Sequence, residues 1–207
     1  MTIAKKEKQL RDLDSNRIAQ AALSVADELG FEGFSMRAVA KALDVTPMAL
    51  YHHVKDKAGL VALVVDATMR AVELPLTTGD WREDLWVMAK WSRQISINHP
   101  TVSRLRREYQ IWTPSMLQKT ERWLSLWQQS GLPLEKAVLA AKSSGKAIAG
   151  LAEEEIVMRD MPLPDEDTLA MLPNVRVMYS GDNNVEAEFE LAVKSLIDGV
   201  YQNLSSD

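Results

Sequence analysis

Apolar residues recur at the spacing of an α-helix along almost the whole chain. The first such stripe consists of Ile18, Ala22, Val25 and Leu29. Asp14 or Ser15 is suited to the N-terminal end of this helix, and Gly30 is suited to its C-terminal end. We find no convincing run in which β-branched and polar residues alternate, as they would in a strand. The pattern therefore predicts an all-α fold.

Three shorter apolar-spaced segments follow the first helix. Ser35, Thr46 and Asp56 precede these segments, and all three residue types cap helix N-termini well. Pro47 follows Thr46 at the first helical position, where the N–H group that proline lacks is not needed. The helix that starts at Asp56 is expected to continue to Leu74. The two short helices joined by LDVT, residues 43–46, fit a helix-turn-helix.

Longer helices are expected near residues 81–98, 101–111, 114–130, 134–159 and 185–204. LPLTTGD at 74–80 is the clearest break before them. The segments 161–174 and 179–184 are predicted to form a long, irregular and mobile connection. We therefore expect a three-helix domain that contains the helix-turn-helix over residues 1–57, a connecting helix over 56–74, and a second helical domain over 75–207.

The second helix of the helix-turn-helix has the chemistry of a DNA-reading element. It is short, so its first turn can enter a major groove about 12 Å wide. Met48 and Ala49 are small or flexible enough to approach base edges, and Thr46 can hydrogen-bond to a base or a phosphate. The residues expected to contact the DNA backbone from its flank are Tyr51, His53 and Lys57.

The stretch ELGFEGFSMRAVAKALDVTPMALYHHVKDKAGL, residues 28–60, resembles the DNA-binding domain of the TetR family of transcriptional regulators. The matching features include the start of the second helix, G-F-S-M-R-x-V-A, and the motif L-Y-x-H-V-K-x-K at residues 50–57. The resemblance implies base contacts from Arg37, Thr46, Pro47, Met48 and Ala49, and phosphate contacts from Tyr51, His53 and Lys57. His52 either joins them or faces solvent.

Tryptophan, tyrosine and methionine are dense in the second part of the chain, where core packing explains any single one of them. Their density, together with the family resemblance, predicts a mostly apolar small-molecule pocket with a few polar groups. The residues expected to line it are Met88, Ser92, Arg106, Tyr109, Trp112, Trp123, Trp127, Lys146 and Glu154.

The helix over residues 131–155 is similar to the matching helix of the tetracycline repressor, with Glu154 at the acidic position. Arg106, however, stands where that repressor has a metal-binding histidine, and no histidine follows His99. We therefore expect neither a metal–tetracycline site nor another cofactor. Arg106 instead suggests an aromatic ligand with an acidic or carbonyl-bearing group.

Two helices have faces suited to a two-fold dimer, which the family resemblance also implies. The residues expected in the interface are Ala140, Ser144, Ala147, Leu151, Phe189, Val193, Leu196 and Val200. The alternative is that these faces pack within their own subunit.

Composition excludes several other classes of protein. The chain has no cysteine, so disulfides and thiol chemistry are excluded. No apolar run reaches the roughly 18 residues that a membrane span needs, and the charged N-terminus is not a secretory signal; we expect a cytoplasmic protein. The net charge of −5 is not evenly distributed along the chain. Residues 1–57 carry nine basic and eight acidic side chains, so the negative charge belongs to the rest of the chain.

The sequence therefore predicts a dimeric repressor that a small ligand releases from palindromic operator DNA. An enzyme is not expected, because neither a nucleophile–histidine–acid trio nor a phosphate-binding loop is present. Glu153–Glu155 is expected to be a solvated helix end rather than a catalytic site. The alternative is a ligand-independent DNA-binding regulator or adaptor with a filled core.

Overall fold

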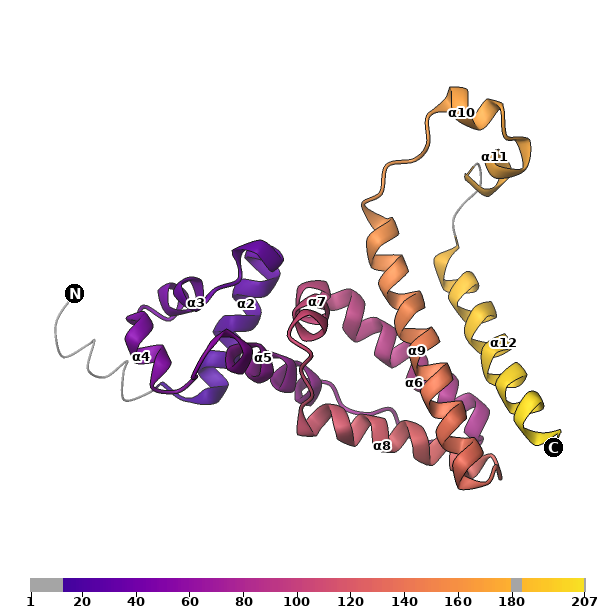
Figure 1. Ribbon diagram of the computed structural model, residues 1–207, viewed down its shortest axis with the longest axis horizontal. Coiled ribbons are helices and arrows are strands. Elements are labelled where there is room, and N and C mark those ends of the chain that lie inside the picture. Colours follow the sequence, from indigo (N-terminus) through magenta and orange to yellow (C-terminus); the bar gives the residue numbers. More distant parts are fainter. Residues whose placement is uncertain (1–12, 180–183, 207) are drawn as a thin grey trace. The chain divides into compact units, whose positions relative to one another are not determined.

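The computed structural model describes residues 13–179 and 184–206, and this part of the chain consists of helices and loops without a strand (Figure 1). The predicted all-α fold is confirmed. The charged N-terminal stretch up to residue 12 and residues 180–183 of the second irregular segment lie outside the described residues. Within that described part, no helix is both long and apolar enough to cross a membrane.

The first four described helices are α2 (Ser15–Gly33), α3 (Met36–Ala42), α4 (Pro47–Tyr51) and α5 (Lys57–Ala71). Each begins at the cap that the sequence predicts. The side chains of Asp14, Ser35, Thr46 and Asp56 accept hydrogen bonds from backbone N–H groups of their first turns, over 2.8, 3.2, 3.2 and 2.8 Å. Gly30 has a φ of 66° and interrupts α2 where the helix was expected to end.

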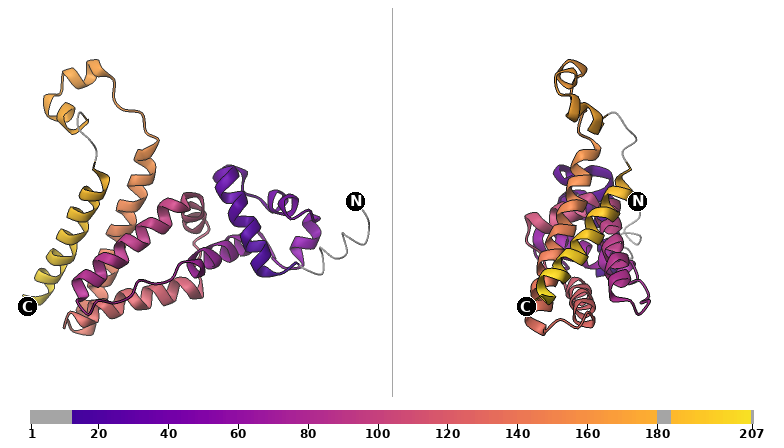
Figure 2. Two further views of the ribbon diagram at one scale, coloured as in Figure 1. Left: turned by 180° about the vertical axis from the view of Figure 1, so that it is seen from behind. Right: turned by 90° about the vertical axis from the view of Figure 1, so that its right-hand side faces the viewer.

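The later helices are α6 (Trp81–Asn98), α7 (Pro100–Glu108), α8 (Pro114–Gln129), α9 (Leu134–Arg159) and α12 (Val185–Ser205). Their bounds lie within three residues of the predicted ones. The segment that was expected to be irregular instead contains two short helices, α10 (Glu166–Ala170) and α11 (Pro173–Tyr179). Figure 2 shows them beyond the ends of α9 and α12. Asp165 caps α10 by accepting a hydrogen bond from the N–H of Thr168 over 2.8 Å.

Two compact units result from the packing of these helices. One contains the described residues up to Leu76 together with Gln94–Trp123, and the other contains Thr77–Arg93 and residues from Leu124 onwards. Packing therefore groups α7 with α2–α5. The predicted domain boundary between residues 57 and 75 separates a DNA-binding part from a ligand-binding part, and packing alone does not test it. This boundary therefore stays a prediction.

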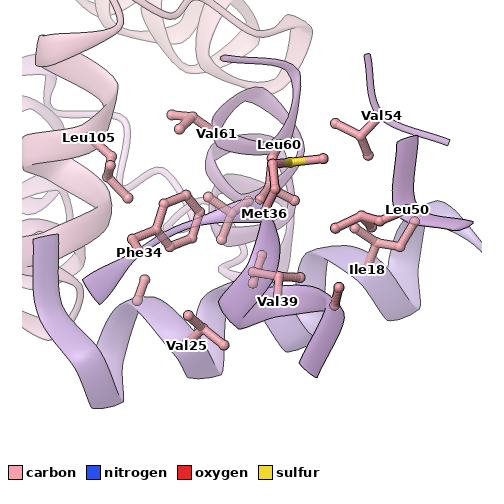
Figure 3. Close-up of a cluster of buried hydrophobic side chains, with 14 of the residues drawn as sticks. Ile18, Val25, Phe34, Met36, Val39, Leu50, Val54, Leu60, Val61 and Leu105 are labelled. Carbon is pink, nitrogen blue, oxygen red and sulfur yellow. The ribbon is translucent and has the colours of Figure 1, made fainter. Parts of the chain in front are cut away.

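The core of the first unit joins α2–α5 to α7 (Figure 3). Ile18, Leu50 and Leu60 are fully buried there. From α7, Leu105 is also fully buried in this cluster, which includes Phe34. Burying such a side chain stabilises the fold by about 1.5–3 kcal/mol. The end of α7 is thereby held against the helices that carry the candidate DNA-binding residues.

In the second unit, α9 and α12 run side by side (Figures 1 and 2). Phe189, Val193 and Ile197 of α12 are buried. Trp127 of α8 is fully buried, and its Nε1 donates a hydrogen bond to Ser144 Oγ over 3.1 Å. This bond satisfies the one polar atom of the indole ring inside the core.

Candidate functional site

The turn between α3 and α4 presents the start of α4 to solvent. Leu43 and Leu50 are buried on either side of the turn and anchor both helices in the core. Asp44 has a φ of 56°, a left-handed conformation that aspartate tolerates better than most residues. Backbone bonds from Asp44 N to Lys41 O and from Val45 N to Ala40 O close the turn over 3.1 and 3.0 Å. The geometry is that of a helix-turn-helix.

Most candidate DNA-binding side chains lie on the exposed surface of this motif. The exposed ones are Arg37, Thr46, Pro47, Met48, Tyr51, His52 and His53. Met48 is 69% exposed and Tyr51 is 48% exposed. The structure therefore brings these seven residues to solvent on one short segment and one neighbouring helix.

Thr46 and Ala49 differ in what they can offer to DNA. Thr46 Oγ1 accepts the N–H of Ala49 over 3.2 Å, which leaves its hydroxyl hydrogen available to a base or phosphate. Ala49 is only 6% exposed, so its methyl group packs into the domain rather than facing outward. The side chain of Ala49 is thus the one candidate base contact that the structure does not bring to this surface.

Lys57 begins α5 and is half-buried rather than exposed. Its Nζ lies 5.7 Å from the ring centroid of Phe34 and 5.6 Å from that of Tyr109. Both distances are within the range of a cation–π interaction. The local sequence predicts Lys57 as a phosphate contact, but no local signal pairs it with a tyrosine at the end of α7.

The candidate ligand-binding residues fall in both compact units. Arg106, Tyr109, Trp112 and Trp123 belong to the first unit, and Met88, Ser92, Trp127, Lys146 and Glu154 belong to the second. Trp112 is 64% exposed, whereas Met88 and Trp127 are buried. One described pocket, of about 170 Å³, lies elsewhere in the second unit, beside Trp86 and Asp198.

The candidate dimer residues divide into two groups. Ala140, Ser144, Phe189 and Val193 are buried within this single chain, so the alternative that these faces pack in their own subunit applies to them. Ala147 and Leu151 of α9 are exposed, and Leu196 and Val200 of α12 are half-buried. A Cβ added at Gly150 or Gly199 would meet nothing within 4 Å, so both helices have open space beside a glycine.

Arg93 joins three helices of the second unit through an ion cluster that the sequence did not predict. Its guanidinium bonds to Glu155 of α9 over 2.6 Å and to Glu186 of α12, and it lies over the ring of Phe189. The hydrogen bond that Arg93 donates to Glu155 raises the pKa of Arg93. Glu155 is therefore half-buried and paired, which corrects the expectation of a solvated helix end. Sequence separations of 62 and 93 residues leave no local signal for such a cluster.

Comparisons with known families cover most of the chain. Residues 18–64 match the family model described as bacterial regulatory proteins of the tetR family. Residues 74–204 match the model described as the tetracyclin repressor-like C-terminal domain. The residues between the two matched ranges, 65–73, contain the end of α5 and the start of the loop that follows it.

Two relatives show how far the similarity extends. The HTH-type transcriptional repressor DrrR1 of Streptomyces coeruleorubidus is 31% identical over 150 residues, which cover 72% of this chain and 56% of that protein. The chain thus spans little more than half of that repressor. The tetracycline repressor protein class E of Escherichia coli is 25% identical over 196 residues, which cover 93% of this chain and 92% of that protein. Both names describe regulators rather than enzymes, in agreement with the sequence-based prediction.

A solved structure has the same fold. The TetR family protein ActR of Streptomyces coelicolor, in complex with actinorhodin, superimposes with a TM-score of 0.75 at 25% identity. The superposition covers 93% of this chain and 97% of that one.

Proposed function

Because the chain belongs to the TetR family of bacterial regulatory proteins, we propose that it is a transcriptional repressor that binds operator DNA through α3 and α4. One observation carries this proposal: the first turn of α4 is held by buried leucines, while Met48 and its polar neighbours stay exposed. An exposed methionine beside a helix N-terminus suits a groove lined by bases and phosphates. DrrR1, which is named as a repressor, supports repression as the outcome of binding.

Selection from a pool of random DNA duplexes tests the proposal. We expect the purified protein to enrich one sequence with two related half-sites about 34–36 Å apart, because a two-fold dimer presents its recognition helices one DNA turn apart. Affinity for the enriched duplex should fall steeply as the salt concentration rises. A plot of the logarithm of the binding constant against the logarithm of the salt concentration should have a slope of about −0.9 for each phosphate contacted. Enrichment of no sequence would refute the proposal.

We further propose that a small molecule releases the protein from DNA. The effector must bind the DNA-incompetent conformation more tightly than the competent one. A coupling of about 3 kcal/mol would weaken operator binding roughly 150-fold. ActR was solved with actinorhodin, which makes actinorhodin a reasonable first probe. Added to the protein–DNA complex, it should lower the bound fraction if this chain accepts a similar ligand.

A regulator that needs no ligand is the second candidate. The full burial of Trp127 favours it, because this predicted pocket residue is packed and hydrogen-bonded to Ser144. Thermal unfolding in the presence of a compound library separates the two. A compound that raises the melting temperature and also releases DNA supports the sensor, whereas a protein inert to every compound supports the ligand-independent regulator.

A further inference from the structure

The ammonium group of Lys57 lies near the faces of two aromatic rings from different parts of the first unit. Phe34, just before α3, is 1% exposed and belongs to the core. Tyr109 follows α7 and packs against the same core. The distances from Lys57 Nζ to the two ring centroids, 5.7 and 5.6 Å, are nearly equal.

We propose that Tyr109 is a positioning residue that holds the ammonium group of Lys57 ready for a DNA phosphate. The inference rests on the proposed function, because it assumes that Lys57 binds the DNA backbone. A lysine side chain is long and flexible, so fixing it in place at the moment of binding costs conformational entropy. A side chain whose ammonium group already contacts two aromatic rings has lost part of this freedom before DNA arrives.

An aromatic partner suits this role better than a carboxylate. The ring face attracts the charge without accepting a conventional hydrogen bond. The N–H donors of the ammonium group therefore remain available to phosphate oxygens. A salt bridge would instead place a negative charge where the phosphate must lie.

The position of Lys57 at the start of α5 also calls for a partner of this kind. A cation at a helix N-terminus is unfavourable, because the helix dipole is positive there. The same N-terminus attracts phosphate. The two rings offset part of the unfavourable interaction in the free protein, and a bound phosphate would offset the rest.

The location of Tyr109 is set by α7 rather than by the helix-turn-helix. Its N–H bonds to Leu105 O over 3.0 Å, and Leu105 is fully buried in the shared core. Gln110, which follows, has a φ of 51°, and Ile111 N bonds back to Arg106 O over 2.9 Å. The chain thus turns sharply at Gln110, directly after Tyr109, and the ring stays beside Lys57 only while the end of α7 keeps this place.

The test compares Tyr109→Leu with Tyr109→Phe, since Phe34 is too deeply buried to replace without loss of the core. Fluorescence anisotropy measures affinity for the duplex that the wild-type protein selects from a random pool. We expect Tyr109→Leu to weaken binding about two- to fivefold per subunit, as loss of one partly solvent-accessible cation–π contact implies. Tyr109→Phe keeps the ring and should bind like the wild type.

A double-mutant cycle with Lys57→Met separates positioning from folding. If Tyr109 acts through Lys57, then Tyr109→Leu should have no further effect once Lys57→Met is present. The salt slope of Tyr109→Leu should also fall toward that of Lys57→Met, which a smaller folded fraction alone would not produce. Lys142→Met, on an exposed part of α9, removes the same charge and should leave the slope unchanged.

The possible results distinguish a failure of the proposed function from a failure of the role assigned to Tyr109. A wild-type protein that selects no sequence would refute the proposed function and this inference with it. A wild-type protein that binds its selected duplex while Tyr109→Leu binds equally well would refute only the role of Tyr109. An equal loss with and without Lys57 would likewise show that Tyr109 acts on the fold and not on the ammonium group.

Discussion

Among single residues, we expect sequence recognition from the exposed side chains of Arg37 and Met48, and sequence-independent affinity from residues that include the half-buried Lys57. Replacing Arg37 or Met48 by alanine should change which bases are preferred, because base edges carry the sequence information. Lys57→Ala should weaken binding to all duplexes alike and reduce the salt slope by about 0.9 per subunit. Repeating the DNA selection with each variant checks this division, and the opposite pattern would contradict it.

Asp66 of α5 connects this helix to the start of α8. Its carboxylate accepts the N–H of Ser115 over 3.3 Å and pairs with Arg70 over 3.0 Å. Burial alone would raise the pKa of Asp66, but the hydrogen bonds from Ser115 and Thr113 and the charge of Arg70 outweigh burial. The pKa therefore lies below its ordinary value of 3.8.

A lowered pKa makes the contribution of Asp66 depend on pH. The contribution to stability is fully present above the unfolded-state pKa and is lost as pH falls through the lower folded-state pKa. Asp66→Asn should thus decrease the free energy of unfolding at neutral pH, and this deficit should shrink as pH drops below the ordinary value of 3.8. Urea unfolding at a series of pH values measures the deficit; a deficit that is unchanged in strong acid would exclude this origin.

At the scale of secondary-structure elements, the N-caps hold the helix-turn-helix in place. Ser35 Oγ accepts the N–H of Ala38 over 3.2 Å at the start of α3. Ser35→Ala should lower the free energy of unfolding by about 1 kcal/mol, whereas Ser35→Asn should retain most of it, because asparagine caps equally well. Denaturant unfolding compares the two variants. Equal losses in both would mean that the hydroxyl does more than cap.

Predictions from the sequence were accurate for helices that have both a cap and an apolar stripe, such as α3, which Ser35 caps, and α4, which Thr46 caps. They failed for α10 and α11, which are short. Val177 and Met178 of α11 are both 72% exposed, so no buried apolar face marks this helix in the sequence. Its stability within a long connection depends on packing against α10 rather than on local periodicity.

At the scale of the whole molecule, the proposed dimer must use surfaces that remain open in the single chain. Ala147 of α9 is exposed, and nothing lies within 4 Å of a Cβ added at the nearby Gly150. Ala147→Glu should convert a dimer to monomers, because an uncompensated charge in a close-packed interface is strongly unfavourable. Light scattering measures the mass, and circular dichroism checks that the helices persist. A dimer that survives the substitution would place the interface elsewhere.

The sequence alone determined the helix caps, the helix-turn-helix and the family resemblance, because these depend on residues close together along the chain. The tertiary structure alone decided which helix faces are internal. Ala140 and Val193, predicted for a dimer surface, are fully buried in their own chain. It also decided that Lys57 meets Tyr109. Contacts between distant segments depend on how helices pack, and apolar periodicity shows that a face is buried but not which partner buries it.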